Sequence, residues 1–246
     1  MIDRDLTKSE LIERVARFYN RYTAELEQIS ELLRIRLTQL SLAYTIKNKL
    51  PPEAVKVFTR VKSQSSFLNK LEAKNWPQFY YPTEIIQDLI GARVVCWFID
   101  DCDGMKQIIQ STEHILIKEE IENYIDKPKK SGYRSIHLQG EIKYDGVNRD
   151  DGNVEISKNS ICCEIQIRTK LQDAWADITH EFHYKAKRDG VSNDVYERVL
   201  ASFADRLAVD EKEMINIREA YQKLADTKLQ EDKREGFQTG IRIVTE

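Results

Sequence analysis

The first fifty residues carry apolar side chains at steps of three and four positions, which is the spacing of one face of an α-helix. Thr7 and Glu10 stand at the spacing of a capping box, in which a hydroxyl and a carboxylate satisfy free amides at a helix start. Pro51 and Pro52 end the region, because proline cannot continue the helical hydrogen-bond ladder. The pattern therefore predicts a long N-terminal helix that packs its apolar stripe on the main body. The stripe consists of Leu11, Val15, Phe18, Tyr22, Leu26, Ile29 and Leu33.

Beyond the prolines the pattern changes to alternating strands and helices. Runs of apolar and β-branched residues predict strands at 55–62, 92–98, 135–144 and 161–168. The intervening segments are interpreted as helices at 63–74, 100–113 and 170–187. Segment 92–98 is almost wholly apolar, which is typical of a central strand. The polar stretch 145–153 is rich in turn residues, so we expect it to connect two strands.

A second long amphipathic helix is predicted from Asn193 to about Leu229. Its periodic apolar positions are Val195, Val199, Phe203, Leu207 and Met214. This stripe could face the sheet or a partner subunit equally well. The chain is thus expected to be an α+β protein, a mixed sheet flanked by helices with long helices at both ends. Its expected parts are a helical region (1–50), a core (51–190), a C-terminal helix (191–235) and a tail or edge strand (236–246).

The composition is that of an ordinary soluble globular protein. Of 246 residues, 32% are charged and 41% hydrophobic, and the net charge of -3 argues against a protein whose main task is to coat nucleic acid. No apolar run approaches the roughly 20 residues that span a bilayer, and the charged N-terminus does not fit a signal peptide. We therefore expect a cytoplasmic protein without membrane contact. The four cysteines include no C-x-x-C pair, which favours buried reduced thiols.

Basic residues gather where the first predicted strand passes into a helix. Arg60 and Lys62 lie two positions apart and so share one face of the strand, while Ser66 and Lys70 lie one helical turn apart. Three cations at a helix start suit a polyphosphate, which needs fixed positive charge and free amides. A solvated basic edge explains the pattern equally well.

A carboxylate and a guanidinium flank the start of the central strand. Asp88 lies just before Gly91, where it is well placed to hold a hard cation such as Mg²⁺ at the end of the sheet. Arg93 lies inside the apolar strand and needs an anionic partner, because a lone buried guanidinium is costly. The simpler alternative is a structural Asp88–Arg93 pair.

A basic loop with proline and glycine leads into strand 135–144. Tyr133 suits stacking on a base, while Lys129, Lys130 and Arg134 suit phosphates. Tyr133 and His137 share one face of the strand. An exposed tyrosine beside glycine is also an ordinary loop residue, so a plain surface loop is the alternative to nucleotide binding here.

Polar residues also alternate along strand 161–168. Glu164, Gln166 and Arg168 project from one face, with isoleucines on the other. Paired with Asp88, Glu164 could complete an acidic metal pocket and could accept a proton from an attacking hydroxyl.

The helix after this strand carries further polar side chains. Asp173 could simply complement the helix dipole, or it could accept hydrogen bonds from N1–H and N2–H of a guanine edge. His180, Tyr184 and Lys185 are more simply explained as bracing the helix on the sheet.

The chain resembles the synthetase domain of the RelA/SpoT family, which makes the alarmones pppGpp and ppGpp. The resemblance spans roughly residues 55–187 and rests on motifs in the family's order. These are R-x-K-x3-S-x3-K, D-L-I-G-A-R-V-V, Y-I-D-K-P-K-K-S-G-Y-R-S-I-H and E-I-Q-I-R-T, followed by W-A-D-I-T-H-E-F-H-Y-K. The resemblance implies a nucleotidyltransferase-like fold with a mixed, roughly five-stranded sheet.

The resemblance also implies an activity, the transfer of the β,γ-pyrophosphate of ATP to the 3′-hydroxyl of GDP or GTP with release of AMP. Asp88 and Glu164 would hold Mg²⁺ and be catalytic, and Glu164 would also activate the hydroxyl. The residues implied to bind ATP are Arg60, Lys62, Ser66, Lys70 and Arg93. Those implied to surround the acceptor nucleotide are Lys129, Tyr133, Arg134, His137, Gln166 and Asp173.

Two departures from the long family members refine this expectation. The first fifty residues contain no histidine, so a hydrolase domain with His-Asp metal motifs is not expected, nor is a regulatory domain after residue 246. The segment Glu119–Glu122 is acidic where bifunctional members tend to be basic, and it could bring a second cation. The chain is therefore expected to be a small single-domain synthetase. Small members are often homotetramers held by terminal helices, and the helix predicted after Asn193 fits such a role.

Two other functions remain open at this point. Toxin-type relatives pyrophosphorylate the 3′ end of tRNA or adenine nucleotides, and a toxin would imply an antitoxin partner. For tRNA, the basic loop and the cluster Lys185–Arg188 would form the grip. A catalytically inactive nucleotide or RNA sensor is the third alternative, and the presence of both Asp88 and Glu164 argues against it.

Overall fold

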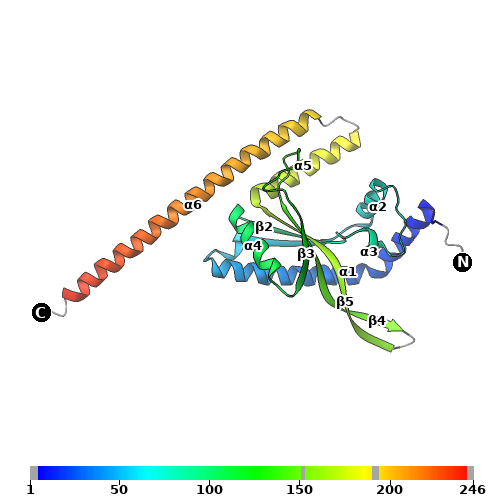
Figure 1. Cartoon of the computed structure of the whole chain (residues 1–246), viewed down its shortest axis with the longest axis horizontal. Helices are drawn as coiled ribbons and strands as arrows, with labels where there is room; N and C mark the ends of the chain where they lie inside the picture. The colour runs from blue at the N-terminus through cyan, green and yellow to red at the C-terminus, as the bar shows by residue number, and fades with distance from the viewer. Residues whose placement is uncertain (1–4, 151–152, 190–193, 243–246) are drawn as a thin grey trace.

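The computed structural model describes residues 5–150, 153–189 and 194–242. Five strands form a single mixed sheet in the order β1-β2-β5-β4-β3 (Figure 1). The strands are β1 (Val55–Val61), β2 (Ile90–Cys96), β3 (Ile115–Asn123), β4 (Ile136–Asp150) and β5 (Asn153–Thr169). Strands β2 and β5 run parallel, and the other neighbours are antiparallel. The expected α+β fold with a five-stranded mixed sheet is confirmed.

Helices cover the sheet and extend from it at both ends of the chain (Figure 1). The helices are α1 (Lys8–Lys47), α2 (Gln64–Ala73), α3 (Pro82–Ile85), α4 (Ile99–Gln110), α5 (Lys170–Asp189) and α6 (Asp194–Arg242), with a short 3-10 turn at Pro52–Ala54. The predicted capping box of Thr7 and Glu10 starts α1. Among the described residues, no helix combines the length and the apolarity needed to cross a membrane.

The core lies between the sheet and the pair α1 and α4, which pack against each other and against one sheet face. The predicted stripe of α1 supplies much of it, and Leu11, Val15 and Leu33 are at most 1% exposed. On β2 and β5, buried residues such as Val94 and Ile165 face this core. Because side chains alternate along a strand, the polar residues between them point to the opposite face.

Strands β4 and β5 are longer than the sequence predicted. The segment 145–153, expected to be a turn, continues the antiparallel ladder from Asp145↔Lys158 to Asp150↔Asn153. The ladder supplies the backbone hydrogen bonds that the local turn propensity would otherwise seek, so cross-strand pairing overrides it. Residues 151–152 lie outside the described residues. The edge strand β3 was not predicted, and the acidic segment Glu119–Glu122 belongs to it.

The end of the chain also differs from the prediction. Helix α6 continues to Arg242, so the tail or edge strand expected at 236–246 is wrong for 236–242, and 243–246 lie outside the described residues. Three residues of its apolar stripe face away from the sheet: Val199 is 60%, Phe203 43% and Met214 46% exposed, whereas Leu207 is half-buried. The side chain of Val195 lies outside the described part. In Figure 1, α6 begins beside α5 and extends past the body.

Candidate active site

The candidate residues lie on the sheet face opposite α1 and α4, and the strand register sets them in rows. Two rows cross the strands: Arg60–Gly91–Glu164 on β1, β2 and β5, and Arg93–Gln166–His137 on β2, β5 and β4. The side chain of Arg60 lies over Gly91, whose missing side chain leaves the middle of the first row open. Arg60 and Glu164 therefore flank one space although more than a hundred residues of chain separate them.

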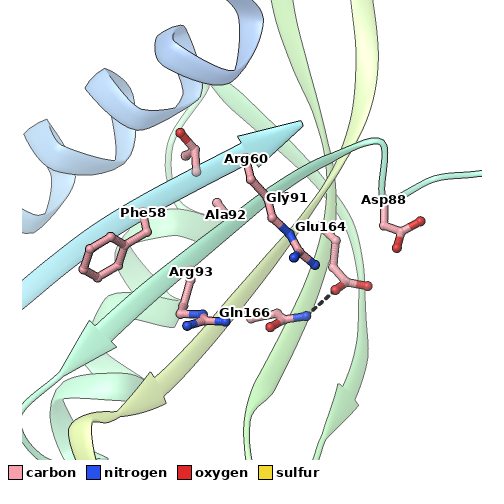
Figure 2. Close-up of a pocket in the computed structure, with 9 residues that line it drawn as sticks. Phe58, Arg60, Asp88, Gly91, Ala92, Arg93, Glu164 and Gln166 are labelled. Atoms are coloured by element: carbon pink, nitrogen blue, oxygen red, sulfur yellow. Dashed lines mark hydrogen bonds between the residues drawn. The ribbon is translucent and has the colours of Figure 1, made fainter. Parts of the chain in front are cut away.

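Two adjoining cavities open on this face. The smaller one, of about 270 Å³, is lined by Asp88 and Glu164 among others (Figure 2). The larger one, of about 630 Å³, is lined by Lys129, Tyr133 and His137 among others. The residues common to both are Arg60, Arg93 and Gln166. The two cavities thus form one continuous polar site with two halves.

In the first half, Asp88 is held between two lysines. Lys62 Nζ lies 2.8 Å from one carboxylate oxygen and Lys70 Nζ lies 2.7 Å from the other. Burial alone would raise the pKa of Asp88, but hydrogen bonds from both lysines outweigh it and hold the pKa below its usual value. The alternative Asp88–Arg93 pair is wrong, because Asp88 is engaged here and Arg93 finds other partners.

Neighbouring helices support this cluster. Tyr19 on α1 donates a 2.7 Å hydrogen bond to the Lys62 carbonyl, and burial together with the charge of Asp88 raises the pKa of Tyr19 to about 12. Ser63 caps α2 by accepting from the Ser66 amide at 3.2 Å, and the two hydroxyls lie 2.9 Å apart. Ser66 therefore serves the helix cap in this structure.

Glu164 lies between the two halves, within a chain of polar contacts. Gln166 Nε2 donates to Glu164 Oε1 at 2.6 Å, and His137 Nδ1 lies 3.8 Å from the same oxygen. The Tyr133 hydroxyl lies 2.9 Å from His137 Nε2. Burial lowers the pKa of His137 below its ordinary value, against the opposing charge of Glu164 and aided by Lys129. The lowered pKa favours the neutral imidazole at neutral pH.

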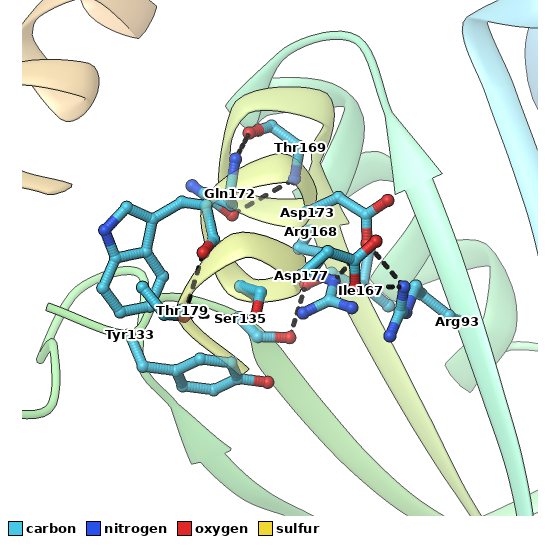
Figure 3. A network of polar contacts seen from close by, with 12 residues as sticks. Arg93, Tyr133, Ser135, Ile167, Arg168, Thr169, Gln172, Asp173, Asp177 and Thr179 are labelled. Atoms are coloured by element: carbon cyan, nitrogen blue, oxygen red, sulfur yellow. Dashed lines mark hydrogen bonds and ion pairs between the residues drawn. The ribbon is translucent and has the colours of Figure 1, made fainter. Parts of the chain in front are cut away.

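Arg93 and the deeply buried Arg168 share Asp173 (Figure 3). Asp173 Oδ1 lies 2.8 Å from Arg168 Nε and 3.0 Å from Arg93 Nη1, and Asp177 Oδ1 lies 3.1 Å from Arg93 Nη1. Asp173 Oδ1 and Arg168 Nε are close without being aligned as a hydrogen bond, so the attraction is Coulombic. Burial, then the charge of Arg93, lowers the pKa of Arg168. Arg93 thus has the anionic partners that its place in an apolar strand required.

The basic loop contributes to the larger cavity in part. Lys129 Nζ lies 4.2 Å from the ring centre of Tyr124 and 5.5 Å from that of Tyr133, and both Lys129 and Tyr133 line the cavity. Arg134 turns instead toward α6, where its Nη2 lies 2.9 Å from Asp205. Of the predicted acceptor residues, Lys129, Tyr133, His137 and Gln166 line the larger cavity. Arg134 and Asp173 are not among its lining residues.

One face of α5 adds cavity residues that the sequence reasoning missed or discounted. Asp177 and Trp175 line the larger cavity, and so does His180, which is exposed rather than bracing the helix. The helical spacing from Asp173 through Asp177 to His180 was the available signal. The side chains of Tyr184 and of the cluster Lys185–Arg188 lie outside the described part.

The described residues contain no group of three or more histidine, cysteine or acidic side chains arranged to hold a metal ion. Asp88 and Glu164 are the two carboxylates that line the smaller cavity. The cysteines of the described chain are free, and Cys96, Cys102 and Cys163 are buried. The expected burial of the thiols holds for these three, and Cys162 is half-buried.

Residues 59–189 match the family described as a region found in RelA / SpoT proteins, and the chain belongs to this family. A similar protein is GTP pyrophosphokinase YwaC of Bacillus subtilis (strain 168), 37% identical over 132 residues, which are 53% of this chain and 59% of YwaC. GTP pyrophosphokinase YjbM of the same strain is 29% identical over 167 residues, 68% of this chain and 74% of YjbM. The match thus spans less than two thirds of YwaC.

Solved structures agree with the fold and its family. A GTP pyrophosphokinase family protein from Streptococcus pneumoniae superposes with a TM-score of 0.68 and 28% identity, over 83% of this chain and 95% of that one. Small alarmone synthetase 1 from Bacillus subtilis, bound to its product pppGpp, superposes with a TM-score of 0.65 and 27% identity, over 84% and 99%. The fold is therefore that of small alarmone synthetases.

Proposed function

We propose that this protein is a small alarmone synthetase that transfers the β,γ-pyrophosphate of ATP to the 3′-hydroxyl of GDP or GTP and releases AMP. One observation carries the proposal: two cavities share Arg60, Arg93 and Gln166, and Glu164 stands beside their junction. A group transfer between two nucleotides needs both substrates side by side, with cations along the transferred phosphates. The family membership of the chain supports the same activity.

The smaller cavity is proposed to bind ATP. Arg60, Arg93 and Asp88 line it, and Lys62 and Lys70 form ion pairs with Asp88. An incoming polyphosphate offers these lysines stronger anionic partners than one carboxylate, and its arrival would free Asp88. Ser66 would contribute to phosphate binding indirectly, through its contacts with Ser63 in the first turn of α2.

Asp88 and Glu164 are proposed to hold Mg²⁺. They line one cavity, and two carboxylates with substrate phosphates are a typical ligand set for this ion. When bound, Mg²⁺ would neutralise charge on the transferred phosphates. Glu164 would also accept the proton of the acceptor hydroxyl, and its carboxylate is oriented for this by the 2.6 Å hydrogen bond from Gln166.

The larger cavity is proposed to bind the guanine nucleotide. Tyr133 would stack on the base with its ring held by His137, and Lys129 would meet phosphates. Asp173 contacts both arginines through Oδ1, so recognition of the guanine edge would fall to Oδ2. Arg134 is proposed to act on the acceptor only indirectly, since it pairs with Asp205.

The test is transfer of label from ATP carrying a radioactive γ-phosphate, with Mg²⁺ and separately GDP, GTP, ADP or deacylated tRNA. We expect label on GDP or GTP and its loss in Glu164→Gln. Glu141→Gln is the matched control, because Glu141 lies on neighbouring β4 in a surface pair with Lys118. Label on tRNA or ADP alone would support the toxin alternative, and no transfer to any acceptor would contradict the proposed activity.

A homo-oligomer is proposed from the outward face of α6. Tyr196, Val199, Ile217, Tyr221 and Leu224 are each at least 60% exposed along this face. Exposed apolar patches of this kind mark interaction surfaces, and a second copy of the chain offers the same patch. Analytical ultracentrifugation should detect an assembly larger than a monomer at micromolar concentration, and a monomer alone would reject the proposal.

A further inference from the structure

Helix α6 presents an unusual face to the body. Ala204 and Glu211 are 4% and 5% exposed, and the side chain of Arg218 is 19% exposed. These three residues recur at seven-residue intervals, so they form one inward stripe of the helix. These three positions are small or charged, and the half-buried apolar residues Leu207 and Ile215 lie beside them, whereas the most exposed apolar side chains lie on the outward face of α6. Close approach at Ala204 and directional polar contacts at Glu211 therefore contribute to the attachment of α6 to the body.

The first of these attachments is the basic loop of the acceptor half. Gly132 has a φ of 89°, and a Cβ placed on it would lie 2.7 Å from Ala204 Cβ and 2.9 Å from Ala201 Cα. Only glycine allows this approach and this backbone conformation. The pair Arg134–Asp205 holds the loop to α6 at the residue next to Ala204. The loop that carries the cavity residue Tyr133 thus rests directly on α6.

The second attachment is the junction of β5 and α5. Thr169 and Gln172 form a capping box at the start of α5: the Gln172 amide donates to Thr169 Oγ1 at 3.2 Å, and the Thr169 amide donates to Gln172 Oε1 at 3.1 Å. Glu211 of α6 accepts from both members, from Thr169 Oγ1 and, at 3.1 Å, from Gln172 Nε2. Arg168 and Asp173 immediately flank this box. The buried carboxylate therefore anchors the segment that supplies them.

The donor half has a different support. Tyr19 of α1 donates to the Lys62 carbonyl, and Lys70 comes from α2. The two halves of the site are thus held by helices from opposite ends of the chain. A disturbance of the α6 contacts should reach the acceptor residues, and Arg93 through Asp173, while leaving Asp88 and its two lysines in place.

We propose that α6 is the positioning element of the acceptor half, with Ala204 seating the basic loop and Glu211 seating the β5–α5 junction. The inference rests on the proposed function for the identity of the acceptor. Neither residue lines either of the two cavities of the site, so both act through the residues that they hold and are positioning residues.

The kinetic test compares Glu211→Ala with Glu211→Gln and with Glu213→Ala, a matched control on the exposed side of α6. Glu211→Ala leaves two buried donors without their acceptor, so we expect KM for GDP or GTP to rise about tenfold while KM for ATP changes much less. Glu211→Gln retains one acceptor oxygen and should lie between Glu211→Ala and the wild type. An equal rise in both KM values, or a loss of kcat alone, would overturn the inference.

A second test needs no nucleotide. In Ala204→Leu the larger side chain would push Gly132 from α6, so trypsin should cleave the loop at Lys129 or Lys130 several times faster than in the wild type. Cleavage within α1 or α2 should be unchanged. Unchanged cleavage of the loop would contradict the positioning role. The proposed function would be contradicted instead if the wild-type protein resisted trypsin at the loop as expected but transferred pyrophosphate to no guanine nucleotide. The two failures are therefore distinguishable.

Discussion

The carboxylate of Asp173, shared by Arg93 and Arg168, is predicted to stabilise the nucleotide-free protein. Asp173 and Asp177 approach the same Arg93 Nη1 at 3.0 and 3.1 Å, but their side chains are 20% and 61% exposed. Only Asp173 also faces Arg168, whose side chain is 2% exposed. The replacement Asp173→Asn keeps the shape and removes the charge. It therefore leaves Arg168 buried without its close counter-ion and still facing Arg93.

Removal of one partner from a buried ion pair costs about 3 kcal/mol or more of unfolding free energy, whereas an exposed pair is worth less than about 1 kcal/mol. We therefore expect Asp173→Asn to lose about 3 kcal/mol and Asp177→Asn less than about 1 kcal/mol. For a chain of this size the first loss corresponds to roughly 6–12 °C in Tm.

Urea denaturation without nucleotide measures the difference directly, with thermal unfolding as a second readout. High salt should reduce the small effect of Asp177→Asn and leave that of Asp173→Asn, because buried pairs are screened less than exposed ones. Equal small losses in the two variants would refute the reasoning, since they would show that Arg168 does not depend on Asp173 for its charge compensation.

Three further predictions follow from single contacts. Gly104→Ala should lower the free energy of unfolding although alanine favours helices, because the added Cβ would overlap the Tyr44 ring; a gain in urea-denaturation midpoint would contradict this. The ion pairs that lower the pKa of Asp88 stabilise the fold above the pKa of its unfolded form, about 3.9, and this stabilisation is lost as pH falls through the folded value; Asp88→Asn should flatten the acid limb of a pH–stability curve. NMR titration of His137 should give a pKa below about 6.5, and a value above it would show that Glu164 dominates over burial.

Local patterns in the sequence determined much of the fold. The three- and four-residue spacing from Leu11 to Leu33 identified α1 and its buried face, because burial of a stripe requires that period. The capping box at Thr7 located the start of this helix. Alternation along β5 separated Glu164 and Gln166 from the core isoleucines. These features depend on neighbours in the chain, so the sequence alone could predict them.

Only the tertiary structure decided which side chains meet. Asp88 takes its partners from positions 62 and 70, whereas the sequence suggested Arg93 as an alternative; strand ends and loop paths determine such contacts. The rows of the site depend on the register between strands, which no local sequence pattern determines. A shift of one residue would move these side chains to the opposite face of the sheet. The long ladder of β4 and β5 similarly replaced the turn that its residues favour locally.

The direction of α6 is the clearest case. Its sequence contains an apolar stripe, and a stripe alone indicates only that something covers it. The structure turns Ala204 and Glu211 inward and leaves Val199 and Phe203 exposed, because Gly132 and the cap of α5 fit the small and the charged positions. The sequence thus determined that α6 is amphipathic, while complementary contacts with distant segments decided which face meets the body.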